Sequence, residues 1–244
     1  MQLNLLAAGP AGIDDEARFE RRDLDDTSWV DVARGLLGGA DDVLDELIVS
    51  TDWRTGRRRM YDRVVDDPRL SRWWRTGEGD PHPLLADART AIERHYRIRL
   101  GGAVLNYYRD GHDSVAYHRD RELRDPQRTV VAILTLGAGR PFRLRPFGGG
   151  LSIDVAPGSG DLIVMGGRCQ ADWEHAVPKV TRPVGPRISV SWRWSGDGSH
   201  HRSHRDVYFR SREWRDARLS GQFIGDEERA PAVDQHERRG ERHG

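Results

Sequence analysis

The feature that most constrains the fold is a run of short strand-like segments between residues 100 and 194. Turns rich in glycine and proline separate the segments, as in GAGRP, FGGG and PGSGD. The predicted strands are 103–108, 114–118, 129–136, 142–145, 151–155, 161–165, 173–177 and 187–194. About eight short strands at such spacing are typical of a two-sheet barrel or a jelly roll. We therefore expect a mainly β (α+β) fold.

The last of these segments, PRISVSWRW, alternates strictly between two kinds of side chain. In a strand, such alternation directs successive side chains to opposite faces of the sheet. One face would carry Arg187, Ser189, Ser191 and Arg193, and the other Ile188, Val190 and Trp192. Two arginines that point into a sheet are costly without anionic partners. A dicarboxylate such as 2-oxoglutarate would supply two carboxylates.

An earlier strand carries a His-x-Asp motif. His118 and Asp120 would point to the same face of that strand and could chelate one metal ion. His175, in DWEHAVPK, is the candidate third ligand. Two histidines and one carboxylate on one side of a metal hold ferrous iron and leave positions open for a cosubstrate and dioxygen. The alternative interpretation is that His118, Asp120 and His175 are three unrelated polar residues that do not bind a common metal ion.

Taken in chain order, these side chains belong to a longer pattern. It consists of Asn106, Tyr108, Gly111, His118, Asp120, His175, Arg187 and Arg193. The pattern resembles that of the AlkB-type, iron(II)- and 2-oxoglutarate-dependent nucleic-acid dealkylases, over about residues 100–194. Ser189 and Ser191 stand where that family more often has asparagine and threonine. Weaker or water-mediated contacts from these two serines to the cosubstrate are therefore expected.

The resemblance implies a double-stranded β-helix core in which both metal-binding segments line one mouth. It also implies Fe(II), 2-oxoglutarate and O2 as cofactor and cosubstrates. Arg187 would then pair with the distal carboxylate of 2-oxoglutarate and Arg193 with the carboxylate near the metal, helped by Asn106 and Tyr108; such charge-assisted pairs also fix orientation. The implied reaction is oxidative dealkylation of N-alkylated bases in DNA, or in RNA, with release of formaldehyde and succinate.

Residues 53–75 interleave arginines with tryptophan and tyrosine, and residues 54–75 contain 8 arginines and 3 aspartates. Guanidinium groups hold phosphates and flat rings stack on bases, so this composition suits a nucleic-acid surface. The other interpretation is a surface hairpin whose tryptophans anchor it to the core. By resemblance, the region forms a nucleotide-recognition lid, in which the stretch RRMYD would bring Arg59 and Tyr61 to the substrate.

Glu122 lies four residues after His118, on the same strand face if the strand continues. N1-methyladenine and N3-methylcytosine carry a positive charge that undamaged bases lack, and a repair dealkylase must draw such a base out of the stack. A carboxylate beside the pocket would favour that cation, and the resemblance points to an acidic residue at this offset. The alternative is a surface ion pair with a neighbouring arginine.

The rest of the chain divides into a preamble, a supporting segment and a tail. We expect an N-terminal preamble at 1–52, the lid and its supporting helix at 53–99, the catalytic core at 100–194, and a polar tail at 195–244 that is largely disordered after about 225. Within the preamble, Asp41 would cap a helix that ends near Val49. A second helix would begin at Pro81 or Pro83 and end near His95, with His82 as a capping histidine.

Composition excludes several classes of protein. The formal net charge is +0, although residues 1–52 contain 13 acidic and only 4 basic side chains. A single cysteine excludes an intrachain disulfide, and neither a signal peptide nor an apolar run of transmembrane length is indicated. These features favour a soluble cytoplasmic protein, and we expect a monomer without a membrane or an obligate protein partner. The resemblance implies that it acts on alkylated DNA or RNA. Two alternatives remain: an oxygenase that acts on a protein or small molecule, and a non-catalytic module that binds alkylated DNA.

Overall fold

The computed structural model describes residues 11–60, 63–120, 125 and 127–195, and the side chains of all of these except 57–60, 63–64 and 195. The helices are α1 Ala40–Ser50, α2 Pro83–Tyr96 and α3 Cys169–Asp172. The strands before the predicted core are β1 Gly12–Ile13, β2 Phe19–Asp23, β3 Ser28–Ala33, β4 Leu37–Gly38, β5 Arg54–Met60 and β6 Arg63–Trp73. The core strands are β7 Val104–Tyr108, β8 Val115–His118, β9 Thr129–Gly137, β10 Arg143–Pro146, β11 Ile153–Asp154, β12 Leu162–Gly167, β13 Trp173–Val177 and β14 Arg187–Ser195.

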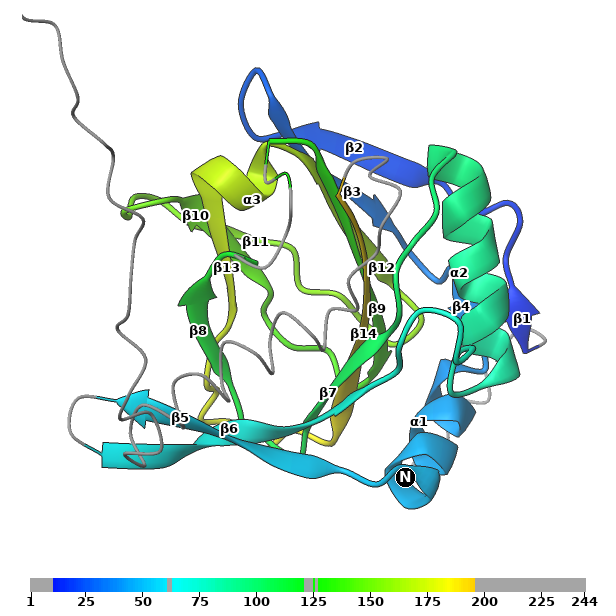
Figure 1. Cartoon of the computed structure of the whole chain (residues 1–244), viewed down its shortest axis with the longest axis vertical. Helices are drawn as coiled ribbons and strands as arrows, with labels where there is room; N and C mark the ends of the chain where they lie inside the picture. The colour runs from blue at the N-terminus through cyan, green and yellow to red at the C-terminus, as the bar shows by residue number, and fades with distance from the viewer. Residues whose placement is uncertain (1–10, 61–62, 121–124, 126, 196–244) are drawn as a thin grey trace, which may run out of the picture. The chain divides into compact units, whose positions relative to one another are not determined.

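Two antiparallel sheets lie face to face, and the helices α1 and α2 cover the outside of the larger one (Figure 1). The larger sheet has the strand order β2-β3-β12-β9-β14-β7-β6-β5, and the smaller has β11-β10-β13-β8. Each predicted core strand is present, with ends displaced by at most about two residues. The predicted mainly β fold is therefore confirmed.

Two apolar clusters hold these layers together. One lies between the larger sheet and the helices and includes Ile188, Val190 and Trp192, each with no exposed surface. The other fills the space between the sheets, where Ile163 and Met165 of β12 pack with Leu144 of β10. The alternation predicted for 187–194 thus places its apolar face toward the helices and its polar face toward the space between the sheets.

Helix α1 begins differently from the prediction. Gly39 is the N-cap, with φ 74° and no side-chain cap hydrogen bond, so the prediction that Asp41 caps the helix is wrong. Asp41 lies inside the first turn, and its carboxylate accepts a hydrogen bond from the Ser159 hydroxyl at 2.5 Å. The left-handed backbone at this position favours glycine, whereas the carboxylate one turn in still interacts with the positive end of the helix dipole. The helix buries Val43, Leu44 and Leu47 on one face.

Helix α2 begins as predicted. Pro83 occupies the first turn, and His82 Nδ1 accepts a hydrogen bond from the Leu84 N–H at 3.1 Å. His95, near the end of the helix, stacks on the Phe19 ring with a centroid distance of 3.8 Å. His82 therefore caps the helix, as the sequence indicated, and His95 contributes to packing.

The arginine- and aromatic-rich segment forms the hairpin β5–β6, and β6 joins the larger sheet by pairing with β7. Trp53 packs on Tyr107 with ring centroids 5.1 Å apart, and Trp74 packs against the apolar cluster beneath the helices. The surface hairpin with anchoring tryptophans, the second interpretation of this segment, is therefore present. The Arg59 side chain, Tyr61, Glu122 and the tail from residue 196 lie outside what the structure describes.

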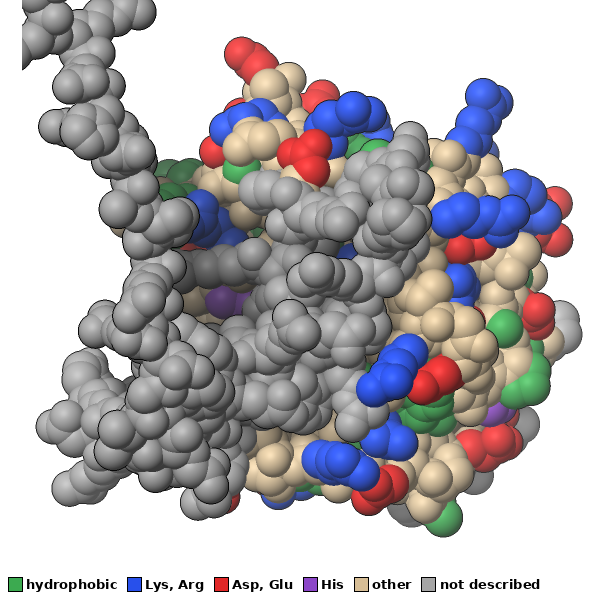
Figure 2. All heavy atoms as spheres, viewed as in Figure 1, with side chains coloured by type: hydrophobic (Ala, Val, Ile, Leu, Met, Phe, Trp, Pro, Cys, Tyr) green, Lys and Arg blue, Asp and Glu red, His purple; other side chains and the backbone are tan. Residues whose placement is uncertain are grey.

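The surface of the described part is mixed in charge. Where Figure 2 shows side chains by type over the helical layer, basic and acidic groups lie next to one another. None of the helices among the described residues combines the length and the apolar character needed to cross a bilayer.

Candidate metal and cosubstrate site

The pairing of β8 with β13 brings two histidines together. His118 and His175 are direct cross-strand partners in this antiparallel pair, and their ring centroids are 4.2 Å apart. Leu144 of β10 pairs with His175 from the other side and is fully buried. Both imidazoles therefore point into the space between the sheets.

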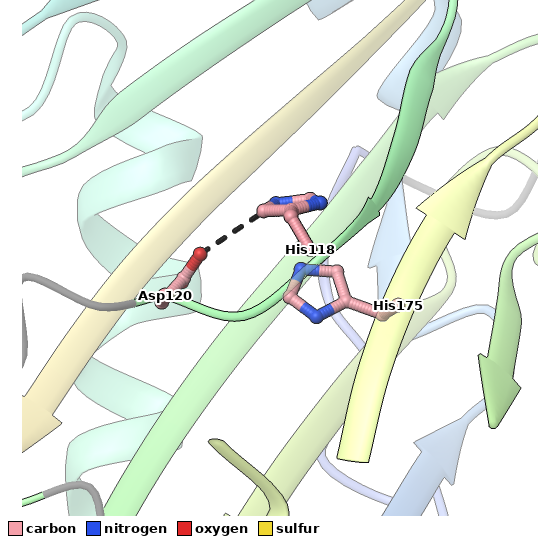
Figure 3. Close-up of side chains that lie close together, drawn as sticks. All are labelled: His118, Asp120 and His175. Atoms are coloured by element: carbon pink, nitrogen blue, oxygen red, sulfur yellow. Dashed lines mark ion pairs between the residues drawn. The ribbon is translucent and has the colours of Figure 1, made fainter. Parts of the chain in front are cut away.

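Asp120 completes the cluster from the segment that follows β8 (Figure 3). Ligand atoms of His118, Asp120 and His175 all lie within 4.8 Å of one another, and this is the group that could hold a metal ion among the described residues. The His118 Nε2 and Asp120 Oδ1 atoms are 3.7 Å apart. Asp120 and His175 are each 5% exposed, whereas the His118 side chain is 37% exposed. The cluster is thus buried on one side and open at His118.

Local interactions prepare these groups to bind a cation. His118 Nδ1 lies 3.0 Å from the Ala116 carbonyl oxygen, so that nitrogen carries the proton and Nε2 is left to bind metal. Burial, together with the nearby His118, lowers the pKa of His175 to about 3, so its imidazole is neutral at physiological pH. Burial alone would raise the pKa of Asp120, but Arg193 and the two histidines outweigh it and hold the pKa well below its usual range. Two neutral imidazoles and a carboxylate fit the donor set of a ferrous facial triad.

Arg187 lies on the polar face of β14 with no exposed surface. Its guanidinium donates to the Ser189 hydroxyl at 3.3 Å, the Thr135 hydroxyl at 3.2 Å and the Arg140 carbonyl at 3.4 Å. None of the carboxylates within the described ranges forms a salt bridge with it, and burial lowers its pKa to about 10. A buried cation surrounded only by neutral acceptors is suited to an anionic ligand.

Arg193 lies further along the same face of β14 and contacts Asp120, one of the three candidate ligands, directly. Its Nε donates to Asp120 Oδ2 at 2.6 Å. The hydroxyl of Ser191 accepts from Arg193 Nη1 at 3.4 Å and donates to the Val104 carbonyl at 3.1 Å. Arg193 is therefore part of the candidate metal site, and among the described residues it makes no ion pair with the acidic preamble.

Strand β7 places the two remaining predicted residues beside β14, with Asn106 opposite Ser189 and Tyr108 opposite Arg187. The Asn106 side-chain oxygen accepts hydrogen bonds from Arg69 Nε and the Ser71 hydroxyl, each at 3.0 Å. Because the oxygen is occupied in this way, the amide N–H groups of Asn106 are left to donate to a ligand.

Several residues that shape the site gave no signal in the sequence. Arg140 is 1% exposed and donates to the carbonyls of Asp110, Asp113 and Pro178. These hydrogen bonds join the loop before β8 to the loop after β13. Arg69 reaches Asn106 from β6. Each of these interactions joins segments that are remote in sequence, so no local pattern could have revealed it.

Comparison with known proteins defines the class. The model of the 2OG-Fe(II) oxygenase superfamily matches residues 46–219, and the chain belongs to this superfamily. Its sequence relatives include AlkB-type proteins. It is 30% identical over 174 residues to alpha-ketoglutarate-dependent dioxygenase alkB homolog 3 of Mus musculus, which covers 63% of this chain and 61% of that protein. It is 29% identical over 141 residues to DNA oxidative demethylase ALKBH2 of Arabidopsis thaliana, which covers 47% of this chain and 44% of the relative.

A solved structure supports the fold assignment. A prolyl hydroxylase from Trichoplax adhaerens, solved with a hypoxia inducible factor peptide, aligns with a TM-score of 0.51 and 14% sequence identity, over 68% of this chain and 83% of its own. At this identity the similarity concerns the fold alone, and it agrees with the predicted jelly roll. The chain spans 61% of the length of the mouse alkB homolog 3 that it matches.

Proposed function

We propose that the chain is a dioxygenase that uses Fe(II) and 2-oxoglutarate to dealkylate N-alkylated bases in DNA, with RNA as an alternative substrate. The observation that carries this proposal is the convergence of His118, Asp120 and His175 within 4.8 Å at the open end of the space between the sheets. The superfamily match and the AlkB-type relatives support the same assignment.

His118, Asp120 and His175 would hold the iron. When bound, iron, 2-oxoglutarate and O2 would supply the oxygen atom that hydroxylates an N-methyl group, which is then lost as formaldehyde, while 2-oxoglutarate takes up the second oxygen atom and is converted to succinate and CO2. The protein's part is to position the groups and exclude water. Asp120 remains ionised because Arg193 lies beside it at 2.6 Å, and the neutral His175 needs to lose no proton before it binds metal.

Arg187 would hold the distal carboxylate of 2-oxoglutarate, since it is fully buried on the polar face of β14 and forms no ion pair with a carboxylate in the described part of the chain. Asn106 and Tyr108 line the neighbouring strand, and Asn106 keeps its amide donors for the cosubstrate. Arg193, already bonded to Asp120, would neutralise the carboxylate nearest the metal. The Ser189 hydroxyl bonds to Arg187, and the Ser191 hydroxyl bonds to Arg193 and to the Val104 carbonyl. The two serines would therefore orient the arginines.

The substrate assignment rests on the β5–β6 hairpin and on the relatives. The hairpin joins the larger sheet next to β7, so it is adjacent to the strand that carries Asn106 and Tyr108. Its arginines, Arg59 among them, and Tyr61 would form a lid that contacts the nucleic acid. The name of one relative, DNA oxidative demethylase, supports DNA as the substrate.

The decisive experiment incubates the protein with Fe(II), 2-oxoglutarate and oligonucleotides that carry N1-methyladenine or N3-methylcytosine. Mass spectrometry of the bases should show loss of the methyl group, with stoichiometric succinate. Unmethylated oligonucleotides of the same sequence are the control. If methylated strands stimulated succinate formation no more than buffer, the substrate assignment would be wrong, and a protein or small molecule would have to be considered. Binding without metal-dependent decarboxylation would indicate a non-catalytic module.

Glu122→Gln is expected to lower kcat/KM for cationic methyl lesions more than for neutral lesions such as ethenoadenine, because it keeps the size of the side chain and removes its charge. Tyr61→Ala should weaken both kinds of substrate alike through lost stacking, worth about 1 to 3 kcal/mol per base. The measurement is kcat/KM for paired oligonucleotides with the two lesion types. An equal effect of Glu122→Gln on both lesions would exclude charge selection by this residue.

A further inference from the structure

Asp120 lies beyond the end of β8, so the strand ladder does not fix its position. Its backbone N–H donates to the side-chain oxygen of Gln170 at 3.0 Å, in a buried contact. Gln170 belongs to the short helix α3 and is 2% exposed. The other end of its amide lies 3.6 Å from the Met165 sulfur, so the side chain is held on both sides.

The outer side of the same segment is fastened to α3 as well. Arg119 Nη1 donates to the Ala171 carbonyl oxygen at 2.6 Å. The Arg119 guanidinium also lies over the Phe147 ring, 3.5 Å from its centroid, and the Phe147 N–H donates to the Asp172 carbonyl at 2.8 Å. Arg119 thus clamps the segment from outside while Gln170 holds it from inside.

Helix α3 runs directly into β13, the strand that carries His175. A contact between Asp120 and α3 therefore sets the distance between the carboxylate and the histidine on the opposite strand. Pairing of the β8 and β13 backbones places His118 opposite His175, whereas the position of Asp120 depends on side-chain contacts such as that with Gln170.

We propose that Gln170 is a positioning residue that holds Asp120 in place as a metal ligand, with Arg119 as the outer part of the same latch. The proposal rests on the proposed metal site. Partners of this kind orient metal ligands, and their loss typically costs about 10- to 100-fold in metal affinity. Gln170→Leu nearly keeps the volume and removes the acceptor, so the Asp120 segment loses its inner hydrogen bond.

The test is equilibrium titration of the full chain with Co(II), monitored by the d–d absorption of the bound ion, which also reports coordination geometry. We expect Gln170→Leu to raise the Co(II) dissociation constant about 10- to 100-fold and to change the d–d spectrum at saturation. The matched control is His82→Ala, which also removes a side-chain acceptor of a backbone N–H but at the start of α2. This control should lower the melting temperature and leave Co(II) affinity unchanged.

Wild-type Co(II) affinity and an unchanged spectrum in Gln170→Leu would show that Gln170 does not position Asp120. If that variant does not fold, Arg119→Met tests the same latch from the more exposed side, with several-fold weaker Co(II) binding expected; wild-type affinity there would overturn it. Failure of the metal site itself is distinguishable, because wild-type protein would then bind no Co(II), or Asp120→Ala would bind it as well as wild type. Either result would remove the proposed function and the latch together.

Discussion

His118→Ala is expected to reduce 2-oxoglutarate turnover and demethylation to less than about one hundredth of the wild-type rate, since loss of a residue that merely supports a ligand already costs about 10- to 100-fold. The variant removes one of three candidate ligands and leaves only a bidentate pair, Asp120 and His175. Of the three, His118 is the best choice because its side chain is 37% exposed and its removal opens no cavity in the core. The melting temperature should therefore stay close to that of wild type.

The matched control is His112→Ala, which removes an exposed histidine from the turn before β8. It should retain wild-type turnover under the same Fe(II) and 2-oxoglutarate concentrations. Succinate formation and base mass are measured for both variants. Demethylation by His118→Ala at the rate of His112→Ala would refute the assignment of the metal site.

Arg187→Met is expected to raise the dissociation constant for 2-oxoglutarate by roughly 10²- to 5 × 10³-fold, which corresponds to the roughly 3 to 5 kcal/mol lost when one partner of a buried ion pair is removed. Arg187 is fully buried and bonded only to neutral acceptors, so the distal carboxylate of 2-oxoglutarate would supply the negative charge that neutralises it. Binding is measured calorimetrically with Mn(II) in the metal site, which separates cosubstrate affinity from turnover.

The same substitution should not lower the melting temperature of the protein in the absence of 2-oxoglutarate. Without 2-oxoglutarate, Arg187→Met should have an unchanged or higher melting temperature, because it removes a buried cation whose pKa is already lowered to about 10 by burial. In wild type, 2-oxoglutarate should raise the melting temperature, and in the variant it should not. Arg182→Met, at an exposed arginine near the start of β14, is the control and should bind 2-oxoglutarate normally. Normal cosubstrate binding by Arg187→Met would exclude Arg187 from the site.

Local sequence was sufficient to predict most of the strands and the faces of one of them. In β14, polar and apolar residues alternate so strictly that Trp192 and Arg187 are predicted on opposite faces from the strand period alone. The His-x-Asp motif also named His118 and Asp120 as a pair, but β8 ends at His118, so the strand period does not place Asp120. The cap of α1 was mispredicted because Asp41 is a good capping residue by type, whereas the left-handed backbone at Gly39 depends on the turn that precedes the helix.

What the sequence determined by itself was the set of chemical groups, their order and the strand faces that carry them. Only the tertiary structure decided which groups meet. The pairing of His118 with His175 depends on the register between β8 and β13, and the bonds of Asp120 to Arg193 and Gln170 depend on where β14 and α3 pack. Hydrogen bonds between segments far apart in the chain set these positions, and no local period encodes such contacts. The candidate metal ligands could therefore be named from the sequence, whereas the residues that contact them from other segments could not.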